Sequence, residues 1–221
     1  MENYKIPPNI DPWDFENGFY LTCQNSRISD TISHLELYKM ILDIPGDIVE
    51  FGVFKGSSLI KFLSFREYYE HYESRKIIGF DIFGKFPDNS KRKNDSIFAQ
   101  EHDSSSGYGI SKNDLNKYLK NKNFKNYDLI EGDIIKTLPE FLNEFPEKRY
   151  ALVHIDVDVY EPTLSILNNI WDKVVNGGIL VLDDYGTVEG ETVAVDEFFK
   201  DKKIQIKKLP YKYKPSYIIK I

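Results

Sequence analysis

The sequence predicts an α/β fold built on a mostly parallel sheet. Three features indicate it: apolar runs of strand length, helical patterns between these runs, and carboxylates directly after several of them. Strands that alternate with helices form βαβ units, whose right-handed crossovers make neighbouring strands parallel. The carboxyl ends of parallel strands share one edge of the sheet, where α/β proteins bind ligands. The carboxylates therefore mark that edge as the expected functional site.

The clearest unit runs from residue 150 to residue 185. Two apolar runs, Ala151 to Ile155 and Ile179 to Leu182, have the length and β-branched composition of strands. Between them, apolar residues at helical spacing predict a helix that ends at Asn176-Gly177-Gly178, a helix-stop sequence. The unit therefore predicts two parallel strands joined by a helix.

Each of these two strands ends in a pair of acids, Asp156 and Asp158 after the first and Asp183 and Asp184 after the second. Two carboxylates about 4 Å apart repel by about 4 kcal/mol at an effective dielectric constant near 20. Such a group must share protons, bind a cation or stay apart. Oxygen ligands without paired Cys or His favour Mg²⁺, Ca²⁺ or Mn²⁺ over zinc. The alternative is that these acids only cap helices and solvate loops, which is less expected for two clusters than for one.

Length and composition indicate one soluble domain. The chain has 221 residues, 41% of them hydrophobic, and a net charge of −6 without a basic stripe, so neither nucleic acid nor a membrane surface is an expected partner. Its one cysteine, Cys23, fits a reducing compartment, and we expect a cytoplasmic protein. No apolar run approaches the roughly 18 residues of a membrane span, and no signal peptide is recognised. We expect residues 1–221 to form a single domain.

The N-terminal segment, residues 1–44, is expected to be irregular up to about residue 25 and helical from Asp30. Prolines at positions 7, 8 and 12 argue against an early helix. The later helix has an apolar face and ends at Pro45-Gly46. Four aromatic side chains in the irregular part should pack over the domain, over a substrate cleft or against another subunit of a possible homo-oligomer: Trp13, Phe15, Phe19 and Tyr20.

A short strand, Ile48 to Phe51, precedes a glycine-containing turn and a helix. Gly52 and Gly56 would let the backbone approach a ligand closely, and Ser57 and Ser58 would begin a helix whose first N–H groups face that ligand. Two glycines alone are a weak signal, because any tight strand-to-helix turn favours glycine. Two acids strengthen it: Glu50 inside the strand, and Asp81 at the end of the next strand, where Rossmann-like folds bind ribose hydroxyls.

The remaining segments complete the alternation. Residues 83–111 are polar and glycine-punctuated without a convincing period, which predicts a mobile lid. A short helix over residues 114–122, a third strand ending in Gly132-Asp133 and a helix over residues 138–145 follow. After the unit at residues 150–185, the sequence predicts an amphipathic helix from Glu191 to Lys200. Two alternating segments on either side of residues 211–215 then predict an antiparallel pair that closes the sheet.

This order of elements resembles a class I S-adenosylmethionine-dependent methyltransferase. Four motifs, GDIVEFGVFKGSS, GFDIFGKFP, HIDVDVYEPT and NGGILVLDDYG followed by AVDEFF, are similar to those of the macrocin O-methyltransferase family. The resemblance covers about residues 44–199. It implies a Rossmann-like, mostly parallel seven-stranded sheet with a C-terminal antiparallel pair and helices on both faces. It further implies methylation of sugar hydroxyls of macrolide-type products with the help of Mg²⁺.

The resemblance also implies roles for individual residues. Catechol-type relatives carry a basic lysine at the position of Val159, so another base is needed here, and Asp156 is our candidate. Asp158, His102 and His154 receive no role, and Asp158 is expected behind the metal ligands. The remaining roles are the methionyl part of the cofactor for Glu50, Gly52, Gly56 and Ser57, the ribose for Asp81, the adenine for Asp133, and the metal for Asp156, Asp183 and Asp184.

We therefore expect an S-adenosylmethionine-dependent, Mg²⁺-assisted O-methyltransferase that acts on a hydroxyl of a sugar or of a glycosylated small molecule. The DVDV motif also allows a haloacid dehalogenase-like phosphatase or a DxD glycosyltransferase, and a non-catalytic cofactor-binding protein of the same fold is a third alternative. The phosphatase fold would need more chain after Asp156, and the glycosyltransferase would leave the glycine turn and Asp81 unexplained. S-adenosylhomocysteine should stabilise only a methyltransferase-like protein.

Overall fold

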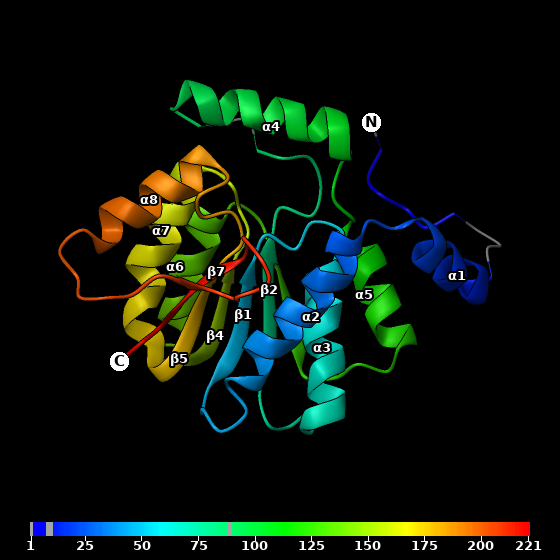
Figure 1. Cartoon of the computed structure of the whole chain (residues 1–221), viewed down its shortest axis with the longest axis horizontal. Helices are drawn as coiled ribbons and strands as arrows, with labels where there is room; N and C mark the ends of the chain where they lie inside the picture. The colour runs from blue at the N-terminus through cyan, green and yellow to red at the C-terminus, as the bar shows by residue number, and fades with distance from the viewer. Residues whose placement is uncertain (1, 8–10, 88–89) are drawn as a thin grey trace.

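A computed structural model describes residues 2–7, 11–87 and 90–221 of the chain. A seven-stranded sheet in the order β3-β2-β1-β4-β5-β7-β6 forms its centre (Figure 1). The predicted fold class is confirmed, including the number of strands and the C-terminal antiparallel pair. The strands are β1 (Asp47–Phe51), β2 (Ile77–Asp81), β3 (Tyr127–Glu131), β4 (Tyr150–Ile155), β5 (Val174–Leu182), β6 (Lys207–Lys208) and β7 (Ser216–Ile219).

The sheet is parallel from β3 to β5 and antiparallel at β7 and β6. Every residue of β4 is buried, as expected for a central strand with helices on both faces. Residues 156 and 183, which follow β4 and β5, therefore lie at the same edge of the sheet. The predicted convergence of strand ends is confirmed.

Helices cover both faces of the sheet, and each face has its own apolar core. Alternate strand residues divide between the two cores: in β1, Ile48 packs on one face and Val49 and Phe51 on the other. The helices on the face of Ile48 are α2 (Asn25–Lys39), α3 (Ser57–Tyr69) and α5 (Lys112–Asn121). The helices on the opposite face are α6 (Ile134–Glu144), α7 (Tyr160–Ile170) and α8 (Glu189–Phe199).

The expectation of an irregular N-terminal segment up to residue 25 was wrong. Helix α1 (Pro12–Thr22) begins with Pro12 in the first turn, where proline costs no hydrogen bond, and the Asp11 carboxylate accepts from the Trp13 N–H at 2.8 Å. Proline here starts a helix instead of breaking one. None of its residues is buried, and Figure 1 shows α1 standing away from the sheet. Residues 1 and 8–10 of this predicted segment lie outside the described residues.

The boundary between α7 and β5 also differs from the prediction. Helix α7 ends at Ile170, a short 3₁₀ turn (Trp171–Lys173) follows, and β5 already begins at Val174. The glycine pair that predicted a helix stop lies inside β5 instead. The reason is pairing with the last strand: Gly177 N–H donates to the Lys220 carbonyl at 2.8 Å, and Lys220 N–H donates to the Gly178 carbonyl at 2.9 Å. Hydrogen bonds with Lys220, which is distant in the sequence, therefore outweigh the local helix-stop sequence.

The predicted lid segment, residues 83–111, contains a helix, α4 (Lys93–Ser106). Figure 1 shows α4 lying across the carboxyl edge of the sheet. Its first turn is held by polar contacts: the buried Asp95 carboxylate accepts from the Tyr160 N–H at 2.9 Å, and Arg92 pairs with Glu189 at 3.0 Å. The contacts of this first turn are polar, and the helix has no regular apolar stripe. The hydrophobic pattern of the sequence therefore did not predict a helix here. Residues 88–89 lie outside the described residues.

At the opposite edge of the sheet, Arg75 joins three segments. Its guanidinium is buried, donates three hydrogen bonds to the Glu70 carboxylate at 2.8–3.0 Å, and donates to the carbonyls of Ile41 and Gly46 at 3.0 and 3.1 Å. These bonds tie the end of α3 to the turn between α2 and β1. A buried pair of this kind is costly to break, because the partner left behind stays charged.

We expect Arg75→Met to lower the free energy of unfolding by about 3–5 kcal/mol, because Glu70 and the carbonyls lose their partner. Lys76→Met is the matched control. It removes the neighbouring, partly exposed pair with Asp128 at 2.8 Å and should cost at most about 1 kcal/mol. Urea unfolding of both variants measures the difference. Equal losses would show that Arg75 does not hold this edge together.

Candidate functional site

A cavity of about 590 Å³ lies at the carboxyl edge of the sheet, beneath α4. Its volume is in the usual range for small-molecule sites. Six of its lining residues were singled out from the sequence: Gly52, Asp81, Asp133, Asp156, Asp158 and Asp184. Four other predicted site residues, Glu50, Gly56, Ser57 and Asp183, do not line it.

The turn after β1 is shaped by the close approach of two backbones. Gly52 has φ +91°, and a side chain there would place its Cβ 1.7 Å from the carbonyl oxygen of Asp156. The Asp156 N–H in turn donates to the Phe51 carbonyl at 2.9 Å. Only glycine fits at this contact. The glycine turn and the acidic strand end are therefore in direct contact.

The Asp81 carboxylate fastens the same turn from the other side. One of its oxygens, Oδ2, accepts from the backbone N–H groups of Val53 and Phe54 at 2.7 and 2.9 Å. Gly56, with φ +83°, then leads into α3, whose first residue is the exposed Ser57. Asp81 thus lines the cavity and also holds the backbone of the loop that forms its wall.

Asp133 lines the cavity beyond the end of β3. Its side chain caps α6 by accepting from the Ile135 N–H at 3.1 Å. A capping carboxylate at this position satisfies one of the free N–H groups at the start of the helix. Asp133 and Asp81 follow the neighbouring strands β3 and β2, on the part of the cavity away from Asp184.

Three carboxylates gather at the ends of β4 and β5. Oxygens of Asp156, Asp158 and Asp184 all lie within 4.8 Å of one another. Asp158 reaches this position through a left-handed backbone conformation with φ +63°. A fourth acid, Glu191, is fully buried behind them; its Oε1 accepts from the Asp184 N–H at 3.1 Å, while its Oε2 has no partner among the described residues.

Burial and mutual repulsion change the proton affinities of this group. Burial raises the pKa of Asp156 well above its usual range, and the charge of Asp183 adds to it. Burial and the charge of Asp184 do the same to the pKa of Asp158. The pKa of Glu191 is raised by burial and by Asp184. These carboxylates therefore accept protons more readily than isolated ones, a property of general bases.

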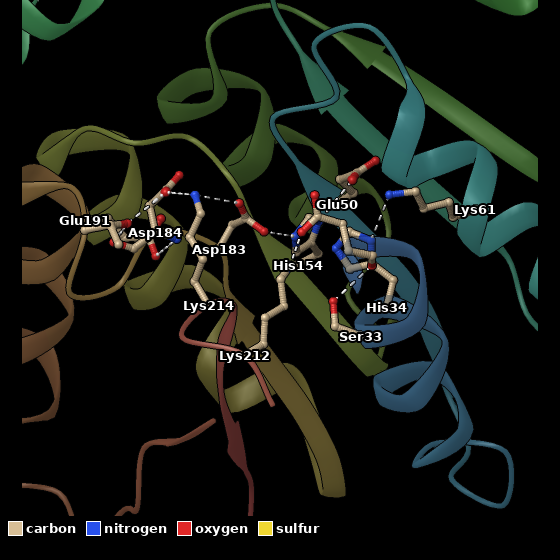
Figure 2. Close-up of polar contacts among 12 residues, drawn as sticks. Ser33, His34, Glu50, Lys61, His154, Asp183, Asp184, Glu191, Lys212 and Lys214 are labelled. Atoms are coloured by element: carbon tan, nitrogen blue, oxygen red, sulfur yellow. Dashed lines mark hydrogen bonds and ion pairs between the residues drawn. The ribbon is translucent and has the colours of Figure 1, made fainter. Parts of the chain in front are cut away.

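Asp183 takes a different direction from the other three, toward a buried histidine (Figure 2). Its Oδ1 lies 3.5 Å from His154 Nε2, an ion-pair distance longer than a good hydrogen bond. His154 Nδ1 lies 3.0 Å from Glu50 Oε1, and both side chains are fully buried. Glu50 of β1, His154 of β4 and Asp183 at the end of β5 therefore form a row of neighbouring side chains across the sheet. Glu50, expected at the cofactor, lies here inside the sheet layer.

The contact between His154 and Asp183 changes the pKa of both groups. Burial alone would lower the pKa of His154, but the contacts with Asp183 and Glu50 raise it well above its usual value. Burial alone would raise the pKa of Asp183, but the contact with His154 outweighs it and holds that pKa at about 2. The pair therefore favours the protonated form of His154 and the ionised form of Asp183.

Lys214 brings a cation to the acidic group from the C-terminal turn (Figure 2). Its ammonium donates to Asp184 Oδ1 and lies 3.7 Å from Asp183 Oδ2, and the side chain lines the cavity. The sequence reasoning missed it, because it sought a cation near Asp156 and found Val159. The signal was nonetheless present: β7 pairs Ser216 with Leu182, and extending this register brings residue 214 opposite residue 184.

Aromatic side chains form part of the cavity roof. His102 on α4 packs its ring 5.0 Å from that of Phe54 and 5.4 Å from that of Phe86. All three residues line the cavity. His102 Nδ1 is buried and has no partner among the described residues, and burial lowers its pKa. The roof thus offers apolar ring faces and one neutral imidazole to whatever enters.

Comparison with known proteins agrees with this geometry. Residues 29–209 match the family described as Macrocin-O-methyltransferase (TylF). The chain is 29% identical over 162 residues to the demethyldecarbamoylnovobiocin O-methyltransferase of Streptomyces niveus, covering 71% of this chain and 59% of that protein. It is 28% identical over 149 residues to the 8-demethyl-8-(2,3-dimethoxy-alpha-L-rhamnosyl)-tetracenomycin-C 4'-O-methyltransferase of Streptomyces olivaceus, covering 64% and 54%. The chain thus spans less than two thirds of the length of these relatives.

Among solved structures, the calicheamicin methyltransferase CalS11 superimposes with a TM-score of 0.73 at 27% identity, over 96% of this chain and 86% of that one. Its apo structure, with a TM-score of 0.69, describes the same enzyme as a TDP-rhamnose 3'-O-methyltransferase. The fold of this chain is therefore that of a class I methyltransferase. No helix in the described ranges is long and apolar enough to cross a membrane.

The contact between the glycine turn and the acidic strand end can be tested with two glycines. Gly52→Ala should lower the free energy of unfolding by about 3 kcal/mol or more, because its Cβ meets the Asp156 carbonyl at 1.7 Å. Gly18→Ala in α1, where no atom lies within 4 Å, should be neutral or stabilise by up to about 1 kcal/mol. Urea denaturation compares them. A loss below about 1 kcal/mol for Gly52→Ala would contradict the close backbone contact.

Proposed function

The chain belongs to the macrocin O-methyltransferase (TylF) family, and from this membership and its cavity we propose that it is an S-adenosylmethionine-dependent O-methyltransferase. The acceptor is a hydroxyl of a sugar or of a glycosylated small molecule, a class supported by the names of the relatives. The observation that carries the proposal is a cavity in which a glycine turn meets a group of proton-accepting carboxylates. Family membership leaves the phosphatase and glycosyltransferase alternatives without support.

We assign the side of the cavity formed by the ends of β1, β2 and β3 to S-adenosylmethionine. Gly52, Asp81 and Asp133 line this side of the cavity. Gly52 would let the backbone approach the cofactor, Asp81 would bind its ribose and Asp133 would lie by its adenine. Gly56 and Ser57 contribute the turn and the start of α3. Glu50 would support this wall without contacting the cofactor, because it is fully buried and paired with His154.

The acidic group fits a hard divalent cation, and Mg²⁺ is our proposal. It offers only carboxylate oxygens, burial and their mutual repulsion raise the pKa of Asp156 and Asp158, and Glu191 Oε2 is buried without a partner among the described residues. Asp156 and Asp184 would hold the ion. Asp158 is a third candidate ligand, because one of its oxygens lies within 4.8 Å of oxygens of Asp156 and Asp184. The family resemblance adds Asp183 as a fourth, and its Oδ2 lies 3.7 Å from the Lys214 ammonium.

The reaction needs an activated and aligned acceptor oxygen. When bound, S-adenosylmethionine supplies an electrophilic methyl group and Mg²⁺ lowers the pKa of the acceptor hydroxyl. Asp156, whose own pKa is raised by burial, accepts the hydroxyl proton on its carboxylate. The cavity walls orient the two reactants, an effect worth about 7–11 kcal/mol in well-aligned systems. Residues 83–111, including α4, act as the lid that excludes water.

The wider setting of the protein is also part of this proposal. We propose a single methyltransferase domain in the cytoplasm, consistent with one free cysteine. Its net charge of −6 is unfavourable for nucleic acid and for anionic membrane surfaces. A homo-oligomer would cover the exposed aromatic residues of α1, among them Trp13 and Tyr20, whose exposed fractions are 68% and 63%.

Asp81→Ala should weaken binding of S-adenosylhomocysteine by about tenfold or more, because the turn loses its anchor and the ribose its acceptor. Isothermal titration calorimetry measures the dissociation constant. Asp128→Ala on the neighbouring strand β3, outside the cavity, is the control and should bind normally. Unchanged affinity in Asp81→Ala would exclude the cofactor role. Failure of the unmodified protein to bind would favour a different function.

Methyl transfer should fall sharply in chelator and return with Mg²⁺, and Asp156→Asn should remain inactive at saturating Mg²⁺, because it lacks the proton acceptor. Transfer from labelled S-adenosylmethionine to glycosylated acceptors measures the rate. The control is Asp172→Asn, an exposed aspartate in the 3₁₀ turn, which should keep full activity. Full activity of the unmodified protein in chelator would remove the metal from the mechanism.

A further inference from the structure

The acidic site of this protein contains a lysine from the turn that leads into the last strand. Lys214 stands two residues before β7, and β7 pairs with β5 so that Ser216 lies opposite Leu182. This pairing ends at Ser216 and Leu182, and Lys214 and Asp184 both lie two residues beyond it. The Lys214 ammonium donates to Asp184 Oδ1 and lies 3.7 Å from Asp183 Oδ2. The end of the β5–β7 pair therefore brings the turn with its charge next to the site.

The turn that carries Lys214 is anchored by the two residues before it. Lys212 forms an ion pair with Asp30 of α2, and the Tyr213 hydroxyl donates to the Gly186 carbonyl at 3.2 Å. Lys214 itself is half-buried, with 42% of its side chain exposed on the side of the cavity. Its aliphatic stem is therefore confined, and the ammonium is held beside Asp183 and Asp184.

The position of this ammonium matters for cation binding. Lys214 contacts Asp184, one of the three carboxylates whose oxygens lie within 4.8 Å of one another, and it approaches Asp183 as well. His154, on the buried side, lies against Asp183 Oδ1 and Glu50. Lys214 lines the cavity and is in direct contact with Asp184. Two positive charges cannot share the same carboxylate oxygens without loss of affinity for one of them.

We propose that Lys214 is an internal counter-ion of the acidic site, which neutralises Asp183 and Asp184 in the metal-free protein and which a divalent cation must displace to bind. The inference rests on the proposed metal site and extends it. It makes Lys214 a positioning residue that sets the affinity of the site for the cation. It also couples cation binding to the turn between β6 and β7, because the displaced ammonium belongs to that turn.

The test compares Mg²⁺ binding to the full chain and to three variants, by calorimetry without cofactor or acceptor. Lys214→Met keeps the length of the side chain and removes its charge, and should bind Mg²⁺ about tenfold more tightly, the size of effect usual for groups around a metal. Lys214→Arg keeps the charge and should bind as weakly as the unmodified chain. Lys203→Met makes the same change in net charge at an exposed position after α8, outside the cavity and outside the turn of Lys214, and should change affinity less than about twofold.

A second measurement does not depend on a binding curve. Without metal, Lys214→Met removes the cation paired with Asp184, so Mg²⁺ should raise its thermal unfolding midpoint by more than it raises that of the unmodified chain or of Lys203→Met. Unchanged or weaker Mg²⁺ binding in Lys214→Met would overturn the proposal. Equal tightening in Lys203→Met would overturn it too, because net charge alone would then explain the effect.

The outcome also separates this inference from the proposed function. If none of the proteins binds Mg²⁺, displacement of Lys214 by a metal is wrong, and so is the metal site on which it rests. Binding of S-adenosylhomocysteine and methyl transfer in chelator would still report on the methyltransferase activity independently. If Mg²⁺ binds equally to all proteins and activity requires it, the proposed function stands and the role of Lys214 falls.

Discussion

The repulsion among carboxylates at the ends of β4 and β5 is the constraint around which the rest of this structure is arranged. Asp156, Asp158 and Asp184 lie together, and Glu191 is buried directly behind them. A folded chain tolerates such a group only if protons, cations or hydrogen-bond donors compensate it. The structure supplies compensation from two directions, with His154 on the buried side and Lys214 on the open side. The raised pKa values of Asp156, Asp158 and Glu191 are the remaining effect of burial and of the repulsion.

The second requirement is that this charged edge stay in register with the cofactor wall. Two contacts achieve it. The Gly52 backbone lies against the carbonyl of Asp156, and the Asp81 side chain accepts from two N–H groups of the turn that follows Gly52. The first contact is between main-chain atoms, and the second joins one side chain to the main chain. The positions of the two halves of the cavity are therefore set by the sheet itself.

Much of this arrangement could be predicted from the sequence, because strand ends of a parallel sheet converge wherever the strands are recognised. The sheet, its C-terminal pair, and the presence of Asp81, Asp133, Asp156 and Asp184 at one cavity follow from that rule. What could not be predicted depends on long-range contacts. The local sequence of the glycine pair in β5, Gly177-Gly178, predicts a helix stop. Its hydrogen bonds with Lys220, the residue after β7, instead hold it in the sheet.

The same limit applies to single side chains of the site. The direction of Asp183 toward His154, and of Glu50 away from the cavity, is decided by packing between strands and α2, which no local pattern encodes. Helix α4 escaped detection because its first turn is fixed by polar contacts rather than by an apolar stripe. Lys214 was missed because it lies 58 positions after Asp156 in the sequence. Strand register would have revealed it.

The attachment of α4 has an evolutionary consequence. Polar contacts hold its first turn, among them those of Asp95 with Tyr160 and of Arg92 with Glu189, and Gly107 ends it. The main-chain contact of Gly52 with Asp156 and the anchoring of its turn by Asp81 do not involve this helix. Substitutions in the first turn of α4 would therefore reshape the space above the carboxylates while leaving the two contacts of Gly52 and Asp81 in place. Such an organisation would allow the acceptor to change while the cofactor wall is retained.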